Sequence, residues 1–354
     1  MRAGAAILAA ALLAGCAHYE VIGYYAGWKD PIAFDARDLT MVNYAFIDFA
    51  FEDRSPALER LASIKRVNPH LKLMASVGGW TGSGPFSNMA STPASRAAFI
   101  DASLRFLARS GFDGIDLDWE YPTAIGVACA PGVTCERPED KRNFIALVRE
   151  MRAAYGNRYL ITIAAGADEK FADGDWMAEL ARSLDWINLM TYDYHGSLGQ
   201  TSGLNAPIDR DPRDTTGASV RESVERLVAS GVPRDKITLG MPFYGKEWAG
   251  CAPGASGEGL YERCAKYVAE FDYADFGGRS GFATHWSESG RVPYLVKRET
   301  GGFITYDDER SIREKSRLVK EWRLRGAMFW ELSADRGGVL RRALASALRA
   351  PSPR

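Results

Sequence analysis

The stretch DGIDLDWEYP at residues 113–122 places three carboxylates at alternate positions in an otherwise apolar run. On a β-strand, side chains two residues apart point to the same face, so Asp116, Asp118 and Glu120 lie together on one side. The residues between them are too apolar for a strand whose second face is solvated, which argues against an exposed acidic edge. The stretch therefore predicts a buried strand with a row of acids along one face.

Seven other short apolar segments have the composition of strands, and amphipathic stretches at 94–110, 139–155, 216–230 and 311–324 have helical spacing. Near-continuous apolar strands need cover on both faces, so the alternation predicts a closed (β/α)₈ TIM barrel. An open doubly wound sheet is the alternative, but no Gly-rich phosphate loop follows an early strand. The eight strand segments start at residues 21, 41, 71, 112, 159, 185, 236 and 326.

The interval 246–302 is too long for a single helical connection between the seventh and eighth strands. It contains two Cys, many Gly and several strand-like pieces, which predict a small inserted α+β lobe. The predicted organisation is a signal peptide at 1–15, a first barrel part at 16–245, the lobe at 246–302 and a last barrel part at 303–350.

The N-terminus has one Arg, about a dozen apolar residues and then small residues, which is the pattern of a signal peptide. Its ending, LAGC at residues 13–16, resembles the bacterial lipobox and predicts lipidation of Cys16. A plain secretory peptide is the alternative. We expect an exported protein whose only membrane contact is this lipid, at the outer membrane or in the periplasm, or otherwise a secreted one.

Four further cysteines remain, an even number that suits an oxidising compartment. Proximity in the sequence suggests that Cys129 pairs with Cys135 and Cys251 with Cys264. A metal cluster is the rival use of four Cys, but no His lies near either pair. The net charge of −1, with no long basic run, argues against nucleic acid as a partner. We expect a monomer.

Glu120 is the acid nearest the C-terminal end of its strand, where active sites of such barrels lie. Neighbouring carboxylates resist ionising together, so at least one keeps its proton and Glu120 is a candidate general acid. A site for a hard divalent cation is an alternative. Asp118 and Glu120 are only about 6 to 7 Å apart at Cα, too close on one strand to flank a glycosidic bond as acid and nucleophile. The attacking group is then expected to come from the substrate.

DGIDLDWEYP resembles the signature of the family 18 glycoside hydrolases, the chitinase family. SVGGW at 76–80, MTYD at 190–193, MPFYG at 241–245 and GAMFWEL at 326–332 resemble its motifs on the third, sixth, seventh and eighth strands. ITYDD at 304–308 resembles the chain's return from the lobe that one branch carries. The resemblance implies retaining hydrolysis of β-1,4 bonds in chitin or N-acetylglucosamine oligosaccharides, without a metal or cofactor.

Carried over by motif, Glu120 protonates the glycosidic oxygen, Asp118 holds the N–H of the substrate's acetamido group and Asp116 sets the charge of Asp118. Tyr192 donates to the acetamido oxygen, whose attack on C1 replaces an enzyme nucleophile. The resemblance also implies sugar binding or support of the acids by Tyr24, Phe46, Ser76, Gly79, Trp80, Met190, Asp193, Tyr244 and Trp330.

Two positions depart from the family pattern. Leu198 stands where the family often has an aromatic residue on the leaving-group side. Lys246 stands where an Arg is common, which replaces a planar guanidinium group with the point charge of an ammonium group. Two other functions stay open at this point. One is cleavage within the chitobiose core of N-glycans, and the other is a non-catalytic chitin-binding lectin, although lectins of this family lose the acid that Glu120 supplies here.

Overall fold

The computed structural model describes residues 19–29, 33–52, 55–124, 126–127, 129, 134–215, 217–277 and 279–351. The predicted signal peptide and Cys16 lie outside these ranges. None of the helices in the described ranges is long and apolar enough to cross a membrane.

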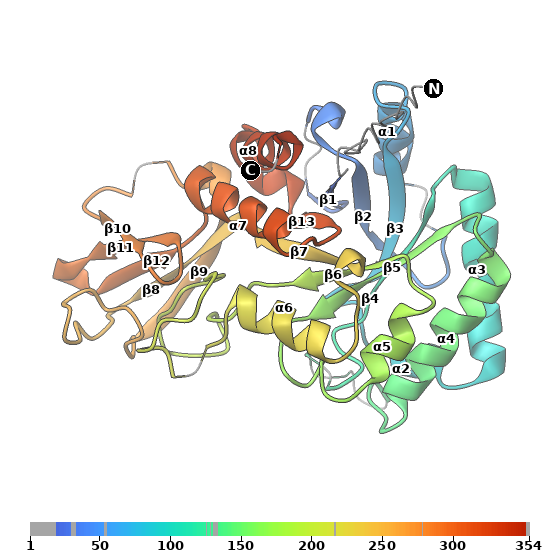
Figure 1. Ribbon diagram of the computed structural model, residues 1–354, viewed down its shortest axis with the longest axis horizontal. Helices are drawn as coiled ribbons and strands as arrows, with labels where there is room; N and C mark the ends of the chain where they lie inside the picture. The colour runs from blue at the N-terminus through green and yellow to red at the C-terminus, as the bar shows by residue number, and fades with distance from the viewer. Residues whose placement is uncertain are drawn as a thin grey trace, which may run out of the picture.

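Eight parallel strands close into a barrel in the order β1-β13-β7-β6-β5-β4-β3-β2 (Figure 1). The predicted (β/α)₈ barrel is therefore confirmed, and each of the eight strand-like segments of the sequence is one of its strands. Buried apolar side chains between strands and helices form its main core. The strands are β1 (Glu20–Ala26), β2 (Met41–Ile47), β3 (Lys72–Gly78), β4 (Gly114–Asp118), β5 (Leu160–Gly166), β6 (Trp186–Met190), β7 (Ile237–Pro242) and β13 (Gly326–Trp330).

The helices begin and end where the sequence supplies caps. Helix α3 starts after Thr92, whose side chain and that of Ser95 form a capping box, and it ends at Gly111 with φ of 74°. A second capping box, Asp308 with Ser311, starts α7. The α-helices in the described residues are α1 (Pro56–Ile64), α2 (Phe86–Ala90), α3 (Pro93–Ser110), α4 (Asp140–Tyr155), α5 (Trp176–Ala181), α6 (Val220–Ala229), α7 (Glu309–Glu321) and α8 (Val339–Arg349).

A five-stranded antiparallel sheet, in the order β10-β11-β12-β8-β9, forms the inserted lobe to one side of the barrel (Figure 1). It is built from strands, and its described residues between β8 and β12 contain 3₁₀ turns but no α-helix. The sheet extends from Tyr244 to Thr305, so both ends of the lobe are paired strands. Its strands are β8 (Tyr244–Ala249), β9 (Lys266–Asp272), β10 (Ala283–Ser287), β11 (Val292–Lys297) and β12 (Gly302–Thr305).

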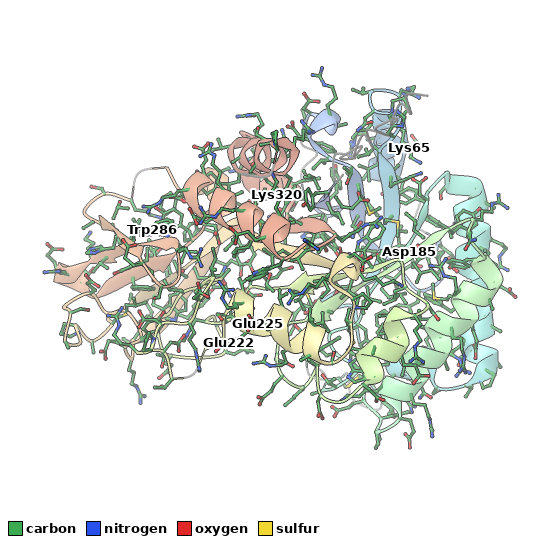
Figure 2. The ribbon with its side chains drawn as sticks, in the orientation of Figure 1. Lys65, Asp185, Glu222, Glu225, Trp286 and Lys320 are labelled. Atoms are coloured by element: carbon green, nitrogen blue, oxygen red, sulfur yellow. A yellow bond between two sulfur atoms is a disulfide. The ribbon has the colours of Figure 1, made fainter. Side chains whose placement is uncertain are left out.

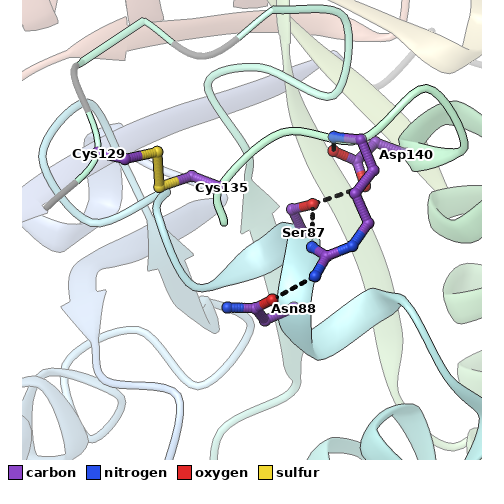
Figure 3. Close-up of a disulfide and its surroundings, with 6 residues drawn as sticks. Ser87, Asn88, Cys129, Cys135 and Asp140 are labelled. Atoms are coloured by element: carbon purple, nitrogen blue, oxygen red, sulfur yellow. Dashed lines mark hydrogen bonds between the residues drawn. A yellow bond between two sulfur atoms is a disulfide. The ribbon is translucent and has the colours of Figure 1, made fainter. Parts of the chain in front are cut away.

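Both cysteine pairs expected from proximity are disulfides. Cys251 and Cys264 join the end of β8 to the segment before β9. Cys129 and Cys135 close a loop between β4 and α4 (Figure 3). Close to this second disulfide, Arg137 donates to Ser87 at 2.7 Å and so ties the loop to α2.

Candidate active site

Strand β4 carries the acids into the barrel and ends at Asp118, so Glu120 lies two residues beyond the strand. Trp119 points the opposite way and is 1% exposed. Its ring stacks on Phe86 of α2 at 5.1 Å and meets Phe144 of α4 edge-on at 5.3 Å. This packing outside the barrel fixes the direction in which its neighbours, Asp118 and Glu120, point inward.

Asp116 is fully buried and accepts hydrogen bonds from four strands. Tyr24 donates at 2.8 Å, Ser76 at 2.8 Å, Thr162 at 2.6 Å and the Asn188 amide at 3.0 Å. Burial raises the pKa of Asp116, but these four donors all favour its carboxylate form. Asp116 is therefore the acid of the row that is best supported as an anion.

Asp118 differs sharply from its neighbour. It is 4% exposed, and its buried Oδ1 has no hydrogen-bond partner within the described part of the chain. Burial raises the pKa of Asp118 well above its usual range, and the charges of Glu120 and Asp116 raise it further. An unpaired carboxyl oxygen beside two other acids favours the protonated form of Asp118 and leaves that oxygen available to a ligand.

Glu120 is 9% exposed, at the surface of the cleft. Ser83 fixes its backbone, because the Glu120 N–H donates to the Ser83 hydroxyl at 2.8 Å while that hydroxyl donates to the carbonyl groups of Gly79 and Asp118. Burial raises the pKa of Glu120 to about 7; a hydrogen bond with Tyr121 opposes the shift, and the charge of Asp193 adds to it. The group can hold a proton near neutral pH and release it in a reaction.

A cleft of about 1780 Å³ runs past these acids between the barrel and the lobe. One wall is aromatic: Phe46 and Trp330 stack at 5.9 Å, and Trp28 stacks on Phe46 at 5.8 Å and lies 6.1 Å from Trp330. Tyr24, which bonds Asp116, lies 5.5 Å from Trp330. The wall is therefore continuous with the network of the acids. Flat, partly exposed rings suit the apolar faces of sugar rings.

A second wall of the cleft is polar and centres on Asp193. Its carboxylate accepts from the Tyr244 hydroxyl at 2.6 Å and forms an ion pair with Lys246. Lys246 is 4% exposed and also donates to the His195 carbonyl at 3.1 Å. The Tyr192 ring meets that of Tyr244 edge-on at 6.2 Å and lines the cleft. The Lys that departs from the family pattern is thus an interior partner of Asp193.

Most of the residues singled out in the sequence line this cleft, but three do not: Asp116, which is fully buried, Ser76 and Gly79. Ser76 is fully buried and bonds Asp116. Gly79, with φ of 80°, lies behind Phe46, whose ring would be 2.3 Å from any Cβ there. Both support the site from behind its surface. Trp80 lies on the rim, 42% exposed, and Leu198 on the polar wall is 89% exposed. Those found along the cleft are Tyr24, Phe46, Trp80, Asp118, Glu120, Met190, Tyr192, Asp193, Tyr244 and Trp330.

Several residues that line the cleft or bond its acids were not predicted from the sequence. Trp28 stands two residues beyond the end of β1, and its place after a strand's C-terminal end could have identified it. Thr162 and Asn188 gave no local signal, because their contact with Asp116 depends on strand register. Glu270 reaches the cleft from β9 in the lobe, whose pairing the sequence left open. Among the described residues, no group of three or more His, Cys, Asp or Glu is placed to hold a metal ion.

Comparison with known proteins agrees with this geometry. The sequence model described as "Glycosyl hydrolases family 18" matches residues 20–335. Chitinase A1 of Niallia circulans is 38% identical over 312 residues, 81% of this chain and 44% of its own length. Chitotriosidase-1 of Mus musculus is 33% identical over 301 residues, 78% of this chain and 61% of its own length.

Two solved structures share the fold over nearly the whole chain. Chitinase ChiA74 from Bacillus thuringiensis has a TM-score of 0.85 at 31% identity, covering 95% of this chain and 70% of that one. A family 18 N-acetylglucosaminidase from Paenibacillus barengoltzii has a TM-score of 0.82 at 36% identity, covering 93% and 100%. The chain spans 44% and 61% of the two curated relatives named above. On the family match and these likenesses, the chain belongs to family 18 of the glycosyl hydrolases.

Proposed function

We propose that this protein is a chitinase that hydrolyses β-1,4 bonds between N-acetylglucosamine units with retention of configuration, using the substrate's own acetamido group as the nucleophile. Its curated relatives include proteins named chitinase and chitotriosidase, and a mutant of a family 18 chitinase from Cycas revoluta, of 25% identity and TM-score 0.79, was solved in complex with (GlcNAc)₄. These names support the proposed substrate class, and the geometry of the cleft supports the proposed reaction.

One observation carries the proposal: the buried, unpaired Oδ1 of Asp118 lies in one row with a Glu120 whose pKa is about 7. A carboxyl oxygen left without a donor in the described part of the chain is costly unless a ligand supplies one. An acetamido N–H is such a donor. We expect the same contact to turn the acetamido carbonyl toward the reacting carbon, so that the substrate supplies the nucleophile.

In the reaction we propose, Glu120 gives its proton to the glycosidic oxygen as the bond to C1 breaks. The acetamido carbonyl oxygen forms a bond to C1, which produces an oxazolinium ion, and an oxygen of Asp118 accepts from the acetamido N–H and so stabilises the positive charge that develops on that nitrogen. Water then adds to C1, gives its proton to Glu120 and restores the acetamide. Two displacements at C1 return the original configuration. Tyr192 donates to the acetamido oxygen, and Trp330 supports the ring.

The Glu120→Gln variant tests this assignment. Glutamine keeps the shape but cannot deliver a proton, so the rate of chitotetraose hydrolysis should fall about 10³- to 10⁴-fold, whereas binding of chitotetraose should persist. Product release by chromatography gives the rate, and calorimetry gives the Kd. Glu59→Gln on the exposed face of α1 is the matched control and should keep wild-type turnover. Unchanged turnover in Glu120→Gln would contradict the proposal.

The same assay separates two rival functions. An enzyme specific for the chitobiose core of N-glycans would release glycans from a high-mannose glycoprotein and leave chitotetraose intact. A lectin would bind chitotetraose and cleave neither substrate. We expect the wild-type protein to cleave chitotetraose at least tenfold faster than the glycoprotein.

A further inference from the structure

Trp28 and Lys29, two and three residues beyond the end of β1, have opposite surroundings. The Trp28 ring is 61% exposed and contacts Phe46 and Trp330 of the aromatic wall. The Lys29 side chain forms ion pairs with Asp272 and Glu331. The segment therefore has an apolar part in the cleft and a charged part that anchors it.

Lys29 bridges two elements that are far apart in the sequence. Its Nζ lies 2.9 Å from an oxygen of Asp272 at the end of β9 and 2.9 Å from Oε1 of Glu331. Glu331 directly follows Trp330, and its side chain is only 2% exposed. Burial lowers the pKa of Lys29, but the hydrogen bonds to Glu331 and Asp272 outweigh it and raise the pKa overall. Lys29 therefore stays charged at every pH at which the enzyme would work.

We infer that Lys29 is a positioning residue that holds Trp28 against Trp330 and so fixes the outer end of the sugar-binding wall. The inference rests on the proposed function, because it assigns a sugar chain to the wall. Its geometric basis is a pair of adjacent contacts: Trp28 meets Trp330 through rings, and the next residues in each segment, Lys29 and Glu331, meet through charges.

Such an anchor matters because Trp28 is the most exposed member of the wall. Fixing an exposed side chain on a loop costs conformational entropy, and a platform ordered in advance removes that cost from ligand binding. The rings also lead outward from the acids. Tyr24 bonds Asp116 and is 1% exposed, Trp330 follows at 5.5 Å, and Trp28 lies beyond it. Only a longer oligosaccharide should reach Trp28.

The test is the dependence of affinity on chain length. In a Glu120→Gln background, Lys29→Met should weaken binding of chitohexaose about three- to tenfold, the size of one lost aromatic contact, and leave chitotriose within twofold. Lys29→Arg should restore the affinity for chitohexaose. In a Trp28→Ala background, Lys29→Met should have no further effect. In active enzyme, KM for chitohexaose should rise while kcat stays constant.

Lys65→Met is the matched control, since Lys65 also forms an ion pair, with Asp113 at 2.6 Å, but is not among the described residues that line the cleft. Figure 2 shows Lys65 and Trp286 of the lobe on opposite sides of the molecule. Lys65→Met should leave both affinities unchanged. Removing Lys29 alone leaves a buried Glu331 without its cation and could destabilise the fold. The double variant Lys29→Met with Glu331→Gln removes both charges and should show the same length-dependent loss.

Equal losses for chitotriose and chitohexaose, or a loss that persists without Trp28, would overturn the inference. A readout independent of catalysis separates it from the proposed function. The part of the tryptophan fluorescence quenching by acrylamide that is lost in Trp28→Phe reports on Trp28 alone. Lys29→Met should increase this part of the quenching. If wild-type enzyme cleaves no chitooligosaccharide while this quenching still responds to Lys29, the proposed function fails and the positioning role stands. Unchanged quenching would contradict the positioning role.

Discussion

The two walls of the cleft hold their functional groups in different ways. Behind the barrel wall, which carries Asp118 and Glu120, Asp116 is fully buried and receives hydrogen bonds from β1, β3, β5 and β6. On the wall formed by the loop after β6 and by the lobe, the Asp193 side chain is 54% exposed and is held by Tyr244 and Lys246 of β8. One acid is fixed by the closed barrel itself, and the other by an inserted strand.

This difference suggests a division of work. Groups fixed from several strands keep their geometry and suit the reacting atoms, where small displacements are costly. A charge held by one inserted strand can change without disturbing the barrel. We propose that the barrel wall carries the residues that take part in the reaction. The lobe wall, which includes Asp193 and Lys246, adjusts the pKa of Glu120 and the affinity for the sugar.

A substitution on the barrel wall should lower the catalytic rate more than a substitution on the lobe wall. Asp118→Ala removes the carboxyl that we propose holds the acetamido N–H, so kcat for chitotetraose should fall about 10²- to 10³-fold, as when one stabilising contact to a transition state is lost. KM should change much less, because the contact matters most in the transition state. Steady-state kinetics measure both values.

Asp101→Ala, an exposed carboxylate on α3, is the control and should keep the wild-type kcat. If Asp118→Ala lowers kcat less than threefold, the chemistry cannot depend on this side chain in the way proposed.

Substitutions of charged residues on the lobe wall should instead shift the pH dependence of kcat/KM. A general acid must be protonated, so kcat/KM should fall as pH rises through the Glu120 pKa of about 7, tenfold per pH unit well above it. Burial is the main cause of the raised pKa, and the Asp193 charge adds to it. Asp193→Asn should therefore shift this alkaline limb to lower pH, by about half a unit to one unit.

Lys246→Met is the matched opposite change, because it leaves the Asp193 carboxylate without its cation. The limb should then move to higher pH by a similar amount. Profiles of kcat/KM between pH 5 and 9 test both variants, and limbs that move in the same direction would refute the tuning role of this wall.

The sequence was sufficient for the barrel and for the acids, for a physical reason. The alternation of Asp116, Asp118 and Glu120 with apolar residues is a local pattern, and a strand turns such a pattern directly into a face. The predicted barrel then identified the end of the strand at which a site forms. The lobe could be recognised because the interval between the last two barrel strands is too long for one helix. Its strand order could not be predicted, because strand pairing is not a local pattern.

Contacts between distant segments were not predictable from local pattern. Thr162 and Asn188 bond Asp116 only because β5 and β6 reach it in this register. The approach of Lys29 to Glu331 depends on the closure of β1 against β13. The packing of Gly79 was also not predictable from its motif, because the Phe46 ring that would lie 2.3 Å from a Cβ there comes from another strand.

The central claim, that the nucleophile belongs to the substrate, is tested most directly by removing that nucleophile. We would compare kcat/KM for chitotetraose with that for a tetramer of the same length whose reacting residue carries a free amine in place of the acetamido group. The account predicts a loss of about 10³-fold or more, because an internal attacking group is lost. Cleavage of both tetramers at similar rates would contradict it and would require a nucleophile from the protein.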